Sequence, residues 1–189
     1  RWGALNVLIN AAGPTGAGIG PFERLDDEAW RATLGMGVLS MVRCVRAALP
    51  LVRKAAWARI VNVSAHSTKR QSVGHAAYTA SKAAMTSVSK NLSLALAPDG
   101  ILVNTVSPGS CLSEALRRYL RSLPAERGVD PESLTDAMRV IREDFGHPAH
   151  LARAGDPAEI GPVIAFLASR VNSYMTGANV NVDGGSDFT

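Results

Sequence analysis

Two residues with complementary acid/base chemistry, Tyr78 and Lys82, lie four positions apart in the segment YTASK. Residues at this spacing share one face of a helix, so a phenol and an ammonium group are brought together. Free tyrosine titrates near pH 10, and a neighbouring positive charge favours the phenolate. The spacing therefore predicts an acid/base pair in which Tyr78 transfers a proton and Lys82 lowers the pKa of Tyr78.

The elements that would position this pair follow a repeated order of strand and helix. Runs rich in β-branched residues occur at residues 6–10, 59–64, 101–107 and 179–183, with helical patterns between them. Such alternation predicts right-handed crossovers and a parallel sheet. The inner runs are almost continuously apolar, which is typical of strands covered on both faces. The fold class is therefore predicted as α/β, a Rossmann-like doubly wound sheet in a single domain over residues 1–189.

Three long helices are predicted to cover the sheet, at about residues 27–49, 77–97 and 157–169. Asp26 is the expected N-cap of the first helix, which also contains Gly35 and Gly37. Each glycine costs a helix about 1 kcal/mol relative to alanine. Close packing against a cofactor or a neighbouring helix is therefore expected to retain them.

A long insertion, residues 111–153, separates two of the predicted strands and contains two amphipathic helical patterns, near residues 114–120 and 131–145. An insertion of this length is expected to be structured. Two interpretations remain open: a lid over a substrate pocket, or a contact between subunits.

The composition limits the classes of partner. The chain is 47% hydrophobic and 19% charged, and its longest apolar runs are far shorter than the roughly 20 residues that span a bilayer, so no membrane segment is predicted. The net charge of +4 is spread along helices with acids between the arginines, so no nucleic-acid partner is expected. The chain begins without methionine or a secretion signal, and a truncated N-terminus is expected.

Cysteine and histidine usage argues against a metal site. Cys44 and Cys111 stand far apart without ligand spacing around them, which favours a reducing, cytoplasmic location over a disulfide or zinc framework. The four histidines are interpreted as surface or lid residues and not as metal ligands: His66, His75, His147 and His150.

The segments that flank Tyr78 and Lys82 resemble those of the short-chain dehydrogenase/reductase family, and they occur in the same order. They are NAAG at 10–13, RIVNVS at 59–64, SPG at 107–109, RAGDPAEI at 153–160, FLAS at 166–169, YMTG at 174–177 and VDGG at 182–185. The resemblance covers essentially the whole chain. It implies an NAD(P)-dependent oxidoreductase that interconverts an alcohol and a ketone or aldehyde.

Roles follow from the resemblance by position. Tyr78 would be the general acid in reduction and the general base in oxidation, and Lys82 would also bind the nicotinamide ribose. The further cofactor contacts that the resemblance implies are Asn10, Ala12 and Gly13 beside the adenosine ribose, Cys111 after Pro108 and Gly109 beside the carboxamide, and Ser113 nearby. The cofactor would be NAD or NADP, the substrate a small alcohol or carbonyl compound, and the assembly a homo-oligomer, a dimer or tetramer.

Two positions depart from the family's pattern. Gly37, seven residues after Trp30, stands in place of an asparagine that supports a water relay, and Ala65 stands in place of the active-site serine. Ser64 should face the opposite side, because strand side chains alternate. Ser64 or Ser67 could reach the site if the strand end bulges or the loop shifts.

The family's glycine-rich phosphate turn and first strands would precede Arg1. The segment at residues 15–20, TGAGIG, is interpreted instead as a loop near the substrate pocket, because no helix starts directly after its glycines. The departures at Gly37 and Ala65 motivate an alternative function. In that alternative the protein is a catalytically impaired, cofactor-binding homologue that acts as a partner or regulatory subunit.

Overall fold

The computed structural model describes residues 3–14, 16 and 18–186, and its centre is a parallel sheet of four strands. The strands are β1 (Val7–Asn10), β2 (Ala58–Val63), β3 (Ile101–Pro108) and β4 (Asn179–Val182). They lie in the order β1-β2-β3-β4, so neighbours in the sequence are also neighbours in space. The register pairs Ile9 with Val61 and Val106 with Val180. The predicted α/β fold with a doubly wound parallel sheet is confirmed.

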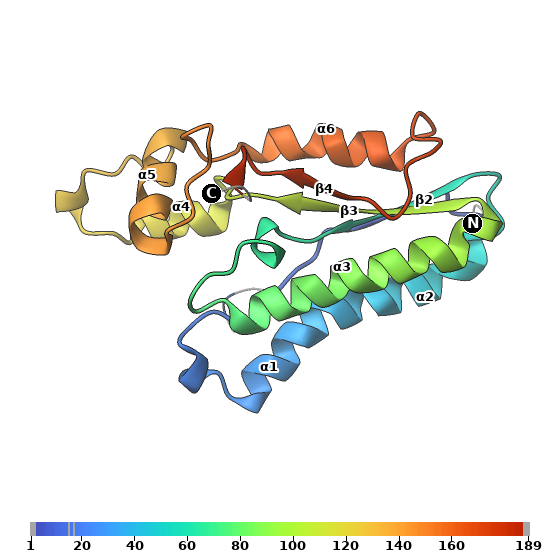
Figure 1. Cartoon of the computed structure of the whole chain (residues 1–189), viewed down its shortest axis with the longest axis horizontal. Helices are drawn as coiled ribbons and strands as arrows, with labels where there is room; N and C mark the ends of the chain where they lie inside the picture. The colour runs from blue at the N-terminus through green and yellow to red at the C-terminus, as the bar shows by residue number, and fades with distance from the viewer. Residues whose placement is uncertain (1–2, 15, 17, 187–189) are drawn as a thin grey trace.

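Helices cover both faces of this sheet (Figure 1). On one face lie α1 (Asp27–Leu34), a π-helical turn (Gly35–Leu39), α2 (Ser40–Val52) and α3 (Ala76–Leu96). On the other face lies α6 (Pro157–Ala168). Successive residues of a strand pack against opposite faces of the sheet. Ile60 packs with Met41 and Met85 under α2 and α3, whereas its neighbour Val61 packs with Leu167 of α6.

Most helix ends agree with the sequence, but the helix expected from about residue 131 begins at Leu134, and the first long helix continues past a proline. Asp26 accepts a hydrogen bond from Ala29 N at 2.8 Å, as expected of an N-cap. The first long helix does not end at Leu49 but runs through Pro50 to Val52. A proline removes only its own N–H donor, and Arg53 N still donates to Leu49 O at 3.0 Å, so the last turn is kept.

The helix Asp27–Val52 is long and apolar enough by composition to cross a membrane, although no membrane segment was expected from the sequence. Its packing explains the composition. Met41, Val45 and Val52 are buried in the core against β2 and α3. Part of the apolar surface of this helix is therefore occupied within the domain, whereas Met36, Leu39 and Leu51 are exposed.

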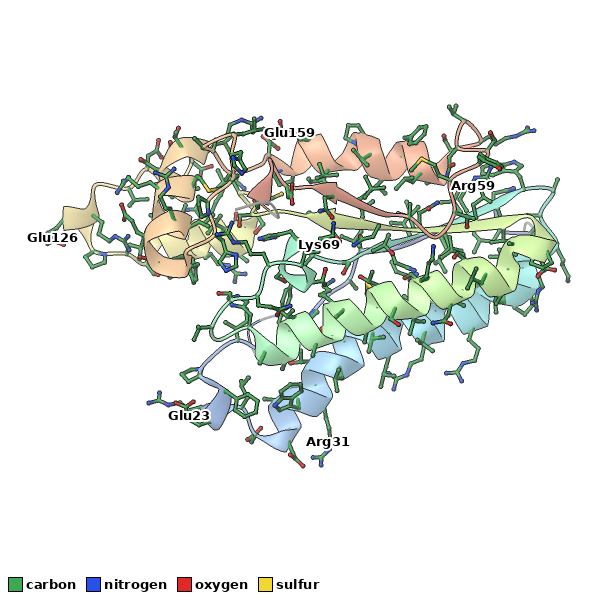
Figure 2. All side chains as sticks on the ribbon, viewed as in Figure 1. Glu23, Arg31, Arg59, Lys69, Glu126 and Glu159 are labelled. Atoms are coloured by element: carbon green, nitrogen blue, oxygen red, sulfur yellow. The ribbon has the colours of Figure 1, made fainter. Side chains whose placement is uncertain are left out.

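The insertion, residues 111–153, folds as a small helical unit with its own core, and we call it the lid. It contains α4 (Glu114–Arg121), a 3-10 turn (Ala125–Arg127) and α5 (Leu134–Phe145). Leu120 and Met138 are buried between the two helices. The lid lies beyond the carboxyl ends of β3 and β4 (Figure 1), and Figure 2 shows Glu126 at its outer tip.

Candidate active site

A cavity of about 540 Å³ lies at the carboxyl ends of the strands, between the sheet and the lid. The structure brings seven of the residues singled out in the sequence to its wall: Gly13, Tyr78, Lys82, Pro108, Gly109, Cys111 and Ser113. Leu116, Ile141 and Phe145 of the lid line the same cavity. This position favours the lid interpretation of the insertion. Ligands of open α/β sheets bind at the same place, outside the carboxyl ends of the strands.

Lys82 is held inside this wall by the backbone of β2. Its side chain is buried, and its Nζ donates to Val63 O at 2.7 Å. Gly13 lies directly beside it, because a Cβ built on Gly13 would be 3.0 Å from Lys82 Nζ. Burial lowers the pKa of Lys82 to about 8. A side chain on Gly13 would therefore crowd the Lys82 ammonium. The turn after β1 and helix α3 are in contact at this point.

Tyr78 is half-buried one turn earlier on α3, and it lines the same cavity. Burial raises the pKa of Tyr78 above its ordinary value. The expectation that Lys82 lowers the pKa of Tyr78 is therefore wrong for this structure. The shared helix face brings the two residues to one cavity, but the Lys82 ammonium is bonded to the Val63 carbonyl and desolvation of the phenol dominates.

Asn10 and Ala12, which were expected beside the cofactor, do not belong to the cavity wall. The Asn10 side chain is buried and donates to Asn62 Oδ1 at 2.7 Å, and Asn62 in turn donates to Ser89 on α3 at 2.8 Å. Ala12 is exposed. The Asn10 amide is therefore used to join β1, β2 and α3, so its role here is to hold the turn that carries Gly13.

The two serines that flank Ala65 have different surroundings. Ser64 lines the cavity, but its hydroxyl donates to Lys82 O at 3.0 Å and lies 2.9 Å from Thr86 Oγ1, so it is bonded to α3. Ser67 also lines the cavity, in a 3-10 turn (His66–Thr68) after β2. Its buried hydroxyl has no hydrogen-bond partner among the described residues. Of the two serine hydroxyls, that of Ser67 is the one without a hydrogen bond among the described residues, so it is the candidate to bond a ligand.

Gly37 lies in the π-helical turn, pressed against α3. A Cβ on Gly37 would lie 2.6 Å from Ser81 Cβ, and Ser81 is fully buried next to Lys82. Gly35, two residues earlier, has no neighbouring atom within 4 Å of such a Cβ. The expectation of close packing is therefore right for Gly37, against a neighbouring helix, and wrong for Gly35.

This difference gives a matched pair of substitutions on one helix. Gly37→Ala is expected to lower the free energy of unfolding by about 1–3 kcal/mol, because the new methyl overpacks against Ser81. Gly35→Ala is expected to raise it by about 0.4–1 kcal/mol, because the backbone there is already helical and the site is open. Urea denaturation measures both, and equal effects would contradict the packing argument.

Three histidines converge on the cavity wall. His147 belongs to the lid, as the sequence suggested, whereas His66 and His75 come from the segment between β2 and α3. His66, His75 and His147 all line the cavity, and we call them the histidine wall. The His66 and His147 rings have centroids 6.0 Å apart, and His75 is 6.0 Å from the Tyr78 ring, both edge to face. His150 is exposed, as expected. Within the part of the chain that the structure describes, no group of three or more potential ligands could hold a metal ion.

Part of this wall had a signal in the sequence. His66 directly follows the strand that ends at the cavity, and His75 precedes Tyr78 by three residues, a spacing that places two side chains together at the start of a helix. His147 gave no such signal. It comes from the loop after α5, and only the position of the lid brings it to the cavity.

The segment after β3 forms the opposite wall and is fixed by close backbone contacts. A Cβ on Gly109 would lie 2.6 Å from Asp183 Cα, so no larger residue fits between β3 and β4 there. Cys111 pairs with Gly155 as an isolated parallel bridge. Burial, with smaller effects of Glu159 and Asp156, raises the pKa of the Cys111 thiol to about 11. Cys111 is therefore a protonated wall residue at neutral pH, not a thiolate nucleophile.

The charged residues at the start of α6 stabilise the structure there. Arg153 forms a two-pronged ion pair with Glu159 at 2.8 and 2.7 Å, and Figure 2 shows Glu159 at the beginning of α6. Glu159 also accepts from Asp156 N at 2.8 Å, which completes a capping box. These bonds tie the end of the lid to α6, next to Cys111.

The glycine-rich segment at residues 15–20 lies partly outside the described residues, since Thr15 and Ala17 are not described. Ile19 lines the cavity, and the next α-helix begins only at Asp27. The described part of the segment therefore supports a loop beside the substrate pocket.

Comparisons with known proteins agree with this geometry. A family model described as enoyl-(acyl carrier protein) reductase matches residues 1–187. The chain is 32% identical to meso-2,3-butanediol dehydrogenase from Serratia marcescens, covering 98% of this chain and 66% of that protein. It is also 32% identical to 2,3-dihydro-2,3-dihydroxybenzoate dehydrogenase from Escherichia coli K12, covering 96% of this chain and 69% of that protein.

A solved structure of 30% sequence identity shares the fold. It is a short-chain oxidoreductase from Pseudomonas aeruginosa PAO1, described as containing an atypical catalytic centre, and it superposes with a TM-score of 0.85 at 30% identity. The match covers 97% of this chain and 67% of that chain. The chain thus spans about two thirds of the length of these relatives. Its motifs, its sheet and these matches place the chain in the short-chain dehydrogenase/reductase family.

Proposed function

We propose that the protein is an NAD(P)-dependent oxidoreductase that interconverts an alcohol and a ketone or aldehyde. The observation that carries the proposal is the presence of Tyr78 and Lys82 on the wall of one cavity at the carboxyl ends of the strands. The dehydrogenase relatives named above support the same class of reaction.

The residues present fit the nicotinamide end of such a cofactor. The Lys82 ammonium is buried beside Gly13, whose lack of a side chain leaves its Nζ accessible to a ligand hydroxyl, and the cavity wall continues over Gly109 to Ser113. Lys82 would hold the ribose, and the backbone around Cys111 would hold the carboxamide. When bound, the nicotinamide would supply or accept the hydride at the reacting carbon of the substrate.

Tyr78 moves the proton that accompanies the hydride. In reduction, its hydroxyl donates a hydrogen bond to the carbonyl oxygen and then transfers the proton as negative charge develops there. In oxidation, the phenolate accepts the proton from the alcohol. The raised pKa of Tyr78 keeps the phenol protonated at neutral pH, which is the state that reduction requires.

Ser67 supplies the second hydrogen bond to the substrate oxygen, in place of the hydroxyl that Ala65 lacks. Its hydroxyl is buried on the cavity wall and unbonded among the described residues, so it can donate to a ligand without breaking an existing bond. A preorganised donor of this kind stabilises the oxyanion character of the transition state.

Ser67→Ala is accordingly expected to lower kcat/KM about 10²-fold, because one donor to the reacting oxygen is lost. Steady-state kinetics of the full-length protein measure the effect. Ser64→Ala is the matched control. It removes a hydroxyl that is bonded to α3, so it should reduce stability by about 1 kcal/mol with little effect on kcat. If Ser64→Ala lowers kcat more than Ser67→Ala does, Ser67 does not have this role.

The experiment that tests the function is a screen of alcohols and carbonyl compounds with the full-length protein, followed by nicotinamide absorbance with NAD(H) and NADP(H). Turnover of at least one class supports an enzyme. Cofactor binding without turnover across the panel supports the alternative, an impaired homologue that acts as a partner or regulatory subunit. Gly37 and Ala65 are the observations that favour this alternative.

A further inference from the structure

The histidine wall carries polar atoms that the protein itself does not use. His75 Nδ1 and His147 Nδ1 are buried and have no hydrogen-bond partner among the described residues. His147 as a whole is only 7% exposed. A buried polar atom without a partner destabilises the folded state, and in native proteins such an atom is usually bonded to a ligand or a water. Both atoms belong to residues of the cavity wall, and Ser67 adds a third unbonded group there.

The charge around these atoms has one sign. No aspartate or glutamate occurs among the described residues that line the cavity. Arg70 lies behind the wall, and its guanidinium donates to the carbonyls of Ser186 and Gly146 at 2.9 and 2.8 Å, which leaves its charge without a carboxylate in these bonds. Among the described lining residues Lys82 is therefore a cation that no carboxylate of the wall opposes, and Arg70 adds positive charge near His147.

The positive charges nearby affect the pKa of His147. Burial, and then the charges of Arg70, His66 and His75, lower the pKa of His147. These are the groups that act on it from the segment after β2 and from the start of α3. At neutral pH the ring is consequently neutral, and one of its nitrogens remains a donor. An anion placed against the ring would offset the neighbouring positive charges and favour uptake of a proton.

We propose that the histidine wall binds a carboxylate of the substrate, so that the enzyme acts on oxo acids and hydroxy acids. The inference rests on the proposed function, because it takes the cavity as the substrate pocket. Tyr78 and Ser67 face the reacting oxygen, while His75 and His147 donate to the carboxylate. Apolar side chains of the lid, Ile141 and Phe145, cover the remainder of the molecule.

The test measures binding and not turnover. Two oxo acids, phenylglyoxylate and 4-oxo-4-phenylbutanoate, are compared with their primary amides by isothermal titration calorimetry on the full-length protein. Each acid–amide pair has nearly the same shape and differs in charge. At least one acid is expected to bind about tenfold more tightly than its amide at about pH 6.5, because hydrogen bonds to a charged group are the stronger ones.

Three variants locate the effect. His147→Phe and, as a second variant at a less buried position, His75→Phe should each reduce the preference to about twofold or less. His150→Gln, which changes an exposed histidine that does not line the cavity, should retain it. Thermal melting confirms that each variant is folded. Equal affinities for acid and amide, a preference that survives both phenylalanine variants, or no binding of any of the four compounds would overturn the inference.

These outcomes are distinguishable from failure of the proposed function. A protein that turns over neutral carbonyl compounds but shows no preference for carboxylates keeps the proposed function and loses this inference. A protein that binds the acids through His147 but turns over no substrate loses the proposed function and keeps the carboxylate site.

Discussion

Tyr78→Phe is expected to lower kcat for carbonyl reduction about 10³-fold, while cofactor affinity changes less than about twofold. The substitution removes only the hydroxyl, which is the group that transfers the proton, and general acid catalysis by a positioned side chain contributes about 10²–10⁴-fold. The ring and its edge-to-face contact with His75 remain, so the helix should be unchanged. Initial rates at saturating cofactor, with cofactor affinity measured by fluorescence titration, give the two quantities.

The pH dependence provides a second check on Tyr78. Because burial raises its pKa, the phenol stays protonated through the neutral range. Reduction is therefore expected to show no loss attributable to Tyr78 between about pH 6 and pH 8, whereas oxidation, which needs the phenolate, should rise with pH over the same range. If Tyr78→Phe keeps more than about a tenth of the wild-type turnover, Tyr78 is not the group that transfers the proton.

Local pattern and strand order account for the part of the site that the sequence predicted. In a parallel sheet the carboxyl ends of all strands meet at one edge, so Gly13 after β1, Gly109 after β3 and the start of α3 had to come together once the strands were recognised. Tyr78 and Lys82 needed only the period of a helix. These residues are specified by short stretches of chain and by topology.

The remaining features depend on contacts between distant segments. The Asn10 amide donates to Asn62, 52 residues later, a contact that local pattern does not predict. The position of His147 is decided by how the lid packs, and the choice between Ser64 and Ser67 by a 3-10 turn that follows β2. Hydrophobic periodicity carries no information on such hydrogen bonds.

The pKa of Tyr78 shows a different limit. The spacing of Tyr78 and Lys82 was a sound predictor of a shared cavity but not of their electrostatics. Which effect prevails depends on how deeply the phenol is buried and on where the ammonium bonds, and Lys82 is bonded to Val63. Proximity in a helix fixes neither quantity.

Lys82→Met is expected to abolish activity and at the same time to stabilise the protein. Lys82 is only 4% exposed, and burial lowers its pKa from 10.5 to about 8. This difference corresponds to roughly 3 kcal/mol of destabilisation at neutral pH, where the ammonium is charged in both the folded and the unfolded chain. Methionine fills a similar volume without charge, but it leaves Val63 O without its donor, which offsets about 1 kcal/mol. A net stabilisation of about 2 kcal/mol should appear in urea denaturation at pH near 7.

The sign of the pH dependence distinguishes this cause from a simple gain in packing. Between about pH 8 and pH 10.5 the folded wild type has released the proton of Lys82 while the unfolded chain still holds it, so the stability of the wild type rises with pH relative to the variant. The advantage of Lys82→Met should therefore be complete below about pH 8 and largely gone near pH 10. An advantage that is constant with pH would mean that the charge of Lys82 is not the source. If Lys82→Met is less stable than the wild type at every pH, the hydrogen bond from Lys82 to Val63 O stabilises the fold by more than desolvation of the ammonium destabilises it.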